Sequence, residues 1–150
     1  MRILIQRVIE ASVTIEGEKV AKIGKGLLVF CGIEEEDTIE DLQWCTSKLL
    51  QLRIFNDDMQ KMNFDIQQVK GSLLVVSQFT LHASTRKGNR PSFIKAAKPD
   101  IAEKLFQNFL EQLKLNFSGT LASGIFGADM KVALINDGPV TIWMDSKNKE

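Results

Sequence analysis

Hydrophobic and polar side chains alternate through the first part of the chain, which predicts paired strands. The alternation covers residues 2–9 and 12–16, and the turn residues Glu16-Gly17-Glu18 precede a further strand-like segment, residues 19–23. A period of two is typical of a strand with one buried face, so we expect a strand followed by a hairpin. The unbroken apolar run of residues 27–33 predicts a strand that is buried on both faces.

Two segments show helical spacing instead. Asp37 and Thr38 are N-cap candidates for a first helix, whose buried face is predicted from the spacing of Ile39, Leu42, Cys45, Leu49 and Leu52. Pro99 suits the first turn of a second, long amphipathic helix with apolar positions at Ile101, Leu105, Phe109, Leu110 and Leu113.

The remaining segments add strands and loops. Residues 53–55, 72–81, 120–125, 128–136 and 140–145 are predicted strands, 56–71 and 82–91 polar loops, and 92–97 a short helical turn. The chain of 150 residues suits a single domain, residues 1–150, in which the charged residues 146–150 are expected to fray. Many strands and two main helices predict an α/β fold with helices covering sheet.

Composition narrows the function classes. Cys31 and Cys45 lie in apolar or helical contexts without any metal-ligand spacing, which favours buried thiols over a disulfide or a zinc site; no cofactor is expected. The N-terminal apolar run is too short for a signal peptide, so a cytoplasmic protein without a membrane span is expected.

The formal net charge is zero, with 19 basic and 19 acidic residues, which argues against non-specific coating of nucleic acid. A basic stretch without an intervening acid nevertheless follows the strand at 72–81: Arg86, Lys87, Arg90, Lys95 and Lys98. Such a run is either a solvated face or a set of phosphate contacts.

Acid–base residues are scarce. The chain has no phosphate-binding glycine loop and a single histidine, His82, which a loop position predicts to be a surface residue. Any hydrolysis by this protein must therefore depend little on a protein base.

Two short segments concentrate polar groups and unusual backbone. Ser77-Gln78-Phe79-Thr80-Leu81 ends a buried strand, where catalytic groups often collect, although an ordinary strand edge has the same composition. By alternation, Gln78 and Thr80 share one face. In Asn136-Asp137-Gly138-Pro139-Val140-Thr141, the proline demands a turn or a break between two good strands, and the base rate favours a trans bond.

These two segments, in this order, resemble the signature motifs of the D-aminoacyl-tRNA deacylases of the D-tyrosyl-tRNA deacylase type. The resemblance extends over essentially the whole chain, through residues 1–8, 87–93 and 124–130. Ser123 stands where that family usually has threonine, which retains the hydroxyl.

The resemblance implies a homodimer with β/β/α layering, mainly antiparallel barrel-like sheets and two active sites at the subunit interface. It implies that Ser77, Gln78, Phe79 and Thr80 form the pocket floor that receives the aminoacylated terminal adenosine. Gly138 and Pro139 are expected to reach, with a cis peptide, into the partner's pocket, where their carbonyls exclude L side chains. Phe126 and Met130 match residues that flank the pocket. Arg7 matches an arginine that holds the Gly-Pro loop, the alternative being an exposed strand arginine.

The implied reaction is hydrolysis of the ester between a D-amino acid and tRNA, which gives chiral proofreading in translation; whether glycine is also removed is left open. An aminoacyl ester is already activated, so positioning and backbone N–H groups near Phe79 and Thr80 are favoured over covalent attack by Thr80. Arg86, Lys87 and Arg90 are expected to contact tRNA. The competing hypotheses are a non-catalytic nucleic-acid-binding dimer and a non-catalytic scaffold.

Overall fold

A central strand, β1, organises the sheet in this computed structural model, which describes residues 1–149. The elements in chain order are β1 (Arg2–Ile15), β2 (Glu18–Ile23), β3 (Gly26–Gly32), α1 (Ile39–Gln51), β4 (Phe55–Asn56), β5 (Met62–Phe64), β6 (Ser72–Ser77), η1 (Phe79–His82), α2 (Pro99–Asn116), β7 (Leu121–Ser123) and β8 (Lys131–Asp145). β1 pairs antiparallel with β2, β3 and β8. β3, β6 and β7 pair in parallel, because each connection between them passes through a helix.

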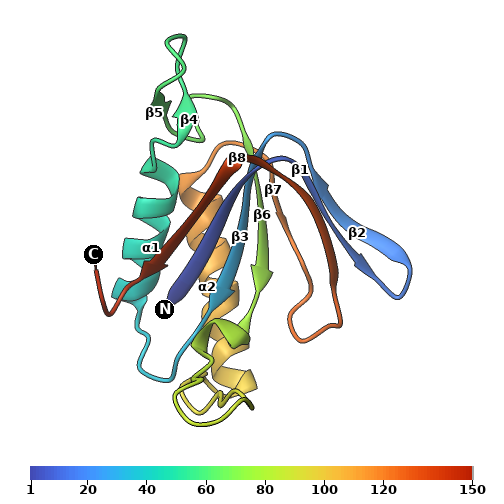
Figure 1. Ribbon diagram of the computed structural model, residues 1–150, viewed down its shortest axis with the longest axis vertical. Coiled ribbons are helices and arrows are strands. Elements are labelled where there is room, and N and C mark those ends of the chain that lie inside the picture. Colours follow the sequence, from blue (N-terminus) through green and yellow to red (C-terminus); the bar gives the residue numbers. More distant parts are fainter. Residues whose placement is uncertain (150) are drawn as a thin grey trace.

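Both helices cover one face of this sheet (Figure 1). Side chains alternate across each strand, so Leu27 and Val29 of β3 face the helices while Leu28 faces the opposite way. The main core joins them to apolar side chains of α1 and α2, including the fully buried Phe109. This explains why β3 reads as a continuous apolar run: both of its faces are covered.

A second core lies on the other face of β3 and β6. There the second half of β1, with β2 and the first half of β8, curls over Leu28, Leu74 and Val76. Figure 1 shows these strands swinging away from the helices as a separate layer. The molecule is thus an α/β fold with β/β/α layering, a nearly closed barrel-like sheet and two main helices, which confirms the expected fold class.

Several predicted boundaries were wrong. The strand expected at 72–81 ends at Ser77 and continues as the 3₁₀-helix η1. The short helical turn expected at 92–97 is a single turn closed by the Ala96 N–H on the Phe93 carbonyl oxygen, and the predicted polar loop 56–71 includes β5 and the second residue of β4. The parallel pairs were not predicted, because period-two alternation carries no information about a neighbour's direction.

The charged tail does not fray at its start, contrary to expectation. Ser146 is buried, its N–H donates to the Met1 carbonyl oxygen, and its hydroxyl accepts from the Met1 ammonium. Lys147 pairs with Asp41 at 2.7 Å. Hydrogen bonds to Met1 and an ion pair with α1 therefore hold this segment; Glu150 lies outside the described residues.

Within residues 1–149, no helix is long and apolar enough to cross a membrane.

Candidate active site

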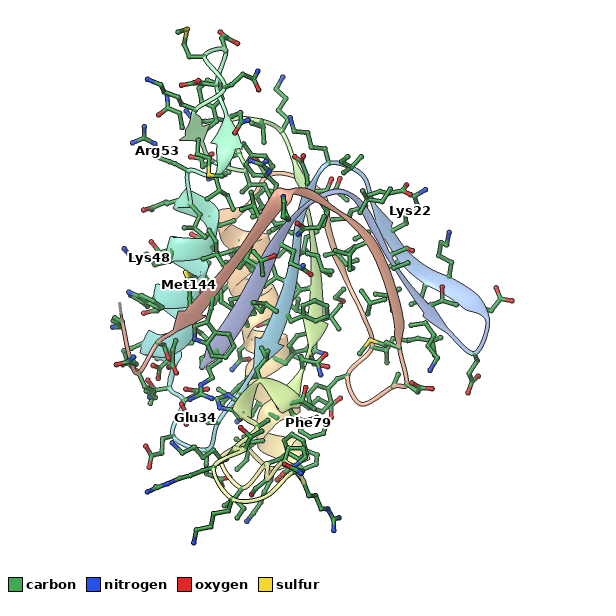
Figure 2. The ribbon with its side chains drawn as sticks, in the orientation of Figure 1. Lys22, Glu34, Lys48, Arg53, Phe79 and Met144 are labelled. Carbon is green, nitrogen blue, oxygen red and sulfur yellow. The ribbon has the colours of Figure 1, made fainter. Side chains whose placement is uncertain are left out.

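A cavity of about 670 Å³ opens where β6 ends and η1 begins. Its lining comes from five parts of the chain: the end of β3, the end of β6, η1, the segment entering α2, and the β7–β8 loop. Among the predicted site residues, it contains Ser77, Gln78, Phe79, Phe126 and Met130. Segments that are far apart in the sequence thus meet at one hollow (Figure 2, where Phe79 is labelled).

The floor of this cavity is made by the change from strand to 3₁₀-helix. The Gln78 N–H still donates to the Cys31 carbonyl oxygen at 2.7 Å, which ties the end of β6 to β3. Gln78 Nε2 then donates to Thr80 Oγ1 at 2.6 Å, so both polar side chains lie together, as predicted, although through the turn rather than through strand alternation. Thr80 itself is exposed beside the cavity and is not among its lining residues.

Aromatic rings shape the cavity walls. Phe79 is 56% exposed, and its ring meets the ring of Phe93 edge-on, with 5.0 Å between centroids. Phe126 packs toward the core against Phe106, with 6.0 Å between their centroids. Met130 lies so close to Gly124 that a Cβ there would overlap the Met130 sulfur. The exposed ring of Phe79 therefore offers an apolar face at the cavity opening, where a planar group can stack on it.

The two buried titratable groups next to the floor, His82 and Cys31, are not suited to proton transfer or attack at neutral pH; the carboxylate of Asp129 and the Lys98 side chain also line the cavity. His82 is 1% exposed, so the prediction of a surface histidine was wrong; its ring packs beneath η1 against Gly32. Burial lowers the pKa of His82, which keeps the imidazole neutral. Cys31 lines the cavity, but burial raises the pKa of its thiol far above the ordinary value, so no thiolate is available as a nucleophile.

Gly138 and Pro139 lie elsewhere in the same chain. β8 remains one strand through them, since residues 137–140 bulge out opposite Arg7 while both flanks pair with β1. The Gly138–Pro139 peptide bond is cis, as the resemblance implied, and Gly138 has φ of +125°, a conformation that favours glycine. Neither residue lines the cavity of its own chain.

Arg7 holds this bulge. The side chain is buried, donates from Nε to the Asp137 carbonyl oxygen at 3.2 Å, and pairs with the Asp137 carboxylate at 3.0 Å. Its Nη1 donates to the Ile54 carbonyl oxygen. Asn136 braces the other side through a 3.1 Å hydrogen bond to the Val140 carbonyl oxygen. The alternative, an exposed strand arginine, is wrong.

The basic stretch follows η1 directly. Arg86, Lys87 and Arg90 are exposed on the loop between η1 and α2, outside the cavity. Lys98 sits at the start of α2 and does line it, as do Ala96, Ala97 and Ala102. The sequence did not predict that Lys98 and these three alanines line the cavity, because small side chains and a single lysine form no motif. The sequence signal near them was Pro99, which predicted the start of a helix.

Comparisons with known proteins agree on one family. The model of the family described as D-Tyr-tRNA(Tyr) deacylase matches residues 4–145. The chain is 61% identical to the D-aminoacyl-tRNA deacylase of Flavobacterium johnsoniae and 57% identical to that of Bacteroides thetaiotaomicron, over 100% of each chain.

Two solved structures share the fold. One, titled c-Myc DNA Unwinding Element Binding Protein, is 41% identical and superposes with a TM-score of 0.93, covering 97% of this chain and 98% of the other. The second, described as a probable eukaryotic D-amino acid tRNA deacylase, gives a TM-score of 0.82 at 17% identity, with coverage of 95% and 97%.

Proposed function

The chain belongs to the D-Tyr-tRNA(Tyr) deacylase family, and from this premise we propose how its cavity carries out the reaction. The protein is a hydrolase that removes D-amino acids from tRNA, and not a non-catalytic nucleic-acid-binding dimer. The observation that carries the proposal is the convergence of Ser77, Gln78 and Phe79 with Phe126 and Met130 on one cavity.

This cavity receives the aminoacylated end of the tRNA. The terminal adenosine lies along the floor at Ser77 and Gln78, beside the exposed ring of Phe79, with Thr80 at the edge of the cavity. Phe126 and Met130 flank the amino acid. The size of the cavity, about 670 Å³, is in the range of small-molecule sites, which suits one aminoacyl-adenosine terminus.

Catalysis relies on positioning rather than on a protein nucleophile. Water attacks the carbonyl carbon of the ester, and the tetrahedral oxyanion collapses as the bond from that carbon to the ribose oxygen breaks. The ribose oxygen takes up the proton that the water lost, and the D-amino acid is released. The N–H groups of Phe79 and Thr80 begin η1 and so lack acceptors within it, which leaves them available to the oxyanion. The adjacent ribose hydroxyl of the substrate assists the water, consistent with the neutral, buried His82 and the protonated Cys31.

The working unit is a homodimer. The Gly138–Pro139 bulge is rigidly held by Arg7 yet lies away from its own cavity, so it acts on the cavity of a second copy. Exposed apolar side chains along the sheet, Ile9, Ile135 and Trp143 among them, supply a surface for that partner. In the dimer, the carbonyls of the bulge form a main-chain wall that an L side chain meets and a D side chain avoids.

Exposed cations next to the floor bind the tRNA. Arg86, Lys87 and Arg90 contact phosphates near the acceptor end, since the loop that carries them follows η1 without a break. The protein accordingly works in the cytoplasm, where aminoacyl-tRNA is used.

The decisive experiment compares release of amino acid from D-aminoacyl-tRNA and from the L form of the same tRNA. The proposal requires rapid release from the D form and little from the L form. Equal release from both forms would contradict the proposed chiral discrimination by the main-chain wall. Release from neither form would contradict the deacylase activity itself.

A further inference from the structure

Arg2 connects the end of the central strand to the turn that forms the floor of the cavity. It is the first residue of β1, paired with Gly32 of β3 on one side and with Asp145 of β8 on the other. Its Nη1 donates to the Leu81 carbonyl oxygen at 3.0 Å. That carbonyl belongs to the last turn of η1, where helical carbonyls have no partner within the helix.

The guanidinium is itself fixed from two more directions. Nε donates to Asp145 Oδ2 at 2.8 Å, and the ring of Trp143 lies 5.6 Å away from the guanidinium carbon. Asp145 is held in turn, because its Oδ1 accepts the Lys147 N–H at 2.9 Å. The Arg2 side chain is 24% exposed and that of Asp145 only 11%, so solvent screens this pair less than it would a surface pair.

The other contacts of η1 are packing contacts with the last residue of β3, which pairs with Arg2. A Cβ at Gly32 would come within 2.9 Å of the Gln78 carbonyl oxygen and 3.1 Å of His82 Cδ2. The turn therefore rests directly on the β3 backbone, with His82 buried behind it. Packing limits how closely η1 approaches β3, and the Arg2 hydrogen bond holds the Leu81 carbonyl group.

We infer that Arg2, oriented by Asp145, is a positioning residue that holds η1 so that the N–H groups of Phe79 and Thr80 point into the cavity. The inference rests on the proposed role of that floor. Arg2 does not line the cavity, so it acts through the Leu81 carbonyl and not by contact with the substrate.

The test is Arg2→Met, which keeps an unbranched apolar stem and removes every donor. Misplacement of reacting groups by about 1 Å can cost roughly a hundredfold in rate, so kcat for D-aminoacyl-tRNA should fall about tenfold to hundredfold, with KM changing less than about threefold. Hydrogen exchange of the peptide that contains η1 should become faster. Arg2→Lys keeps the charge but offers no planar pair of donors, so its kcat and its exchange rate should lie between those of wild type and those of Arg2→Met.

Arg53→Met is the matched control. Arg53 also donates to a backbone carbonyl, that of Asn63 at 2.8 Å, but it lies at the opposite end of the molecule from Phe79 (Figure 2). It should leave kcat and the exchange of η1 unchanged. Asp145→Asn alone and with Arg2→Met completes a cycle in which the two effects on kcat should not add.

The outcomes separate the inference from the proposed function. Wild-type protein that fails to hydrolyse D-aminoacyl-tRNA overturns the function. Active wild-type protein with a folded Arg2→Met variant of unchanged kcat overturns the positioning role. If Arg2→Met does not fold, Arg2→Lys and Asp145→Asn decide the matter, and wild-type kcat in both overturns the inference.

Discussion

Thr80 presents its hydroxyl to Gln78 on the exposed side of η1, and no basic side chain among residues 1–149 is hydrogen-bonded to it. Its Oγ1 accepts from Gln78 Nε2 at 2.6 Å. We expect Thr80→Ala to lose less than about tenfold in kcat, since removal of an essential nucleophile usually costs several orders of magnitude. The measurement is single-turnover deacylation. A loss of that larger size, together with an aminoacyl ester trapped on Thr80 of the wild type, would establish covalent catalysis instead.

Asp145 makes stability depend on pH in the acid range. Burial alone would raise its pKa, but hydrogen bonds from Arg2 and from the Lys147 N–H hold the pKa below the ordinary value. A lowered pKa in the folded state stabilises the fold above the unfolded pKa, and that contribution is lost as the pH falls through the folded value. The free energy of unfolding of wild type should therefore exceed that of Asp145→Asn most above about pH 5, and the difference should shrink below about pH 4.

Urea unfolding of both proteins between pH 3 and pH 7 measures this difference. Lys22→Met, which breaks an exposed pair with Glu10, is the control and should give a small difference at every pH. A difference for Asp145→Asn that stays constant over the whole range would contradict the assignment.

At the scale of elements, the loop between η1 and α2 carries the predicted tRNA-binding cations. Arg86, Lys87 and Arg90 are all exposed on it, beside a cavity edge that Lys98 lines. Replacing the three by Gln should weaken tRNA binding and reduce the log–log salt slope by roughly 0.7–0.9 for each phosphate that is no longer neutralised. Binding of deacylated tRNA at several salt concentrations measures the slope. An unchanged slope would mean that the loop is only a solvated face.

The sequence predicts elements well where one face is buried and less well where the backbone turns. α1 begins directly after Thr38, one of the two expected N-caps, and α2 begins at Pro99, which was expected in its first turn, because the two residue types favour these positions. The end of β6 was missed: Phe79 and Leu81 continue the strand pattern, and the packing of η1 on Gly32 overrides it.

The site was predictable in part. Ser77, Gln78 and Phe79 meet Phe126 and Met130, as the family resemblance implied. Lys98 and Cys31 were not expected to line the cavity, because their contribution depends on how α2 and β3 approach β6, which no local pattern encodes. Likewise, the bulge at Gly138 looked like a turn between two strands, whereas both flanks pair with β1.

At the scale of the whole molecule, the proposed dimer makes a prediction about shared sites. Gly138→Ala places a Cβ within 3.0 Å of Arg7 Nη2 at a φ of +125°, so the bulge is displaced in that variant. Gln78→Ala damages the floor of the cavity instead. Each variant alone should be strongly impaired. Mixed dimers should regain activity, because one of their two sites combines an intact floor with an intact bulge.

Refolding the two variants together, with each alone as control, measures this complementation. Activity should approach about one quarter of wild type after random pairing, since half of the dimers are mixed and each has one intact site. No recovery in dimers shown to be mixed would mean that the bulge serves its own chain.

The pairing of β1 with β8 joins the first strand of the chain to the last. β1 pairs with β3 along one edge and with β8 along the other. One edge of β1 therefore has no partner strand until residues 131–145 have been synthesised and have paired with it. Contacts of such long sequence separation slow folding. During synthesis, therefore, the nascent chain cannot complete its core while those residues remain inside the ribosome, and it must wait with β1 exposed along one edge. A ribosome-bound chain arrested before β8 emerges should be cut readily by protease within β1, and one arrested after β8 emerges should resist.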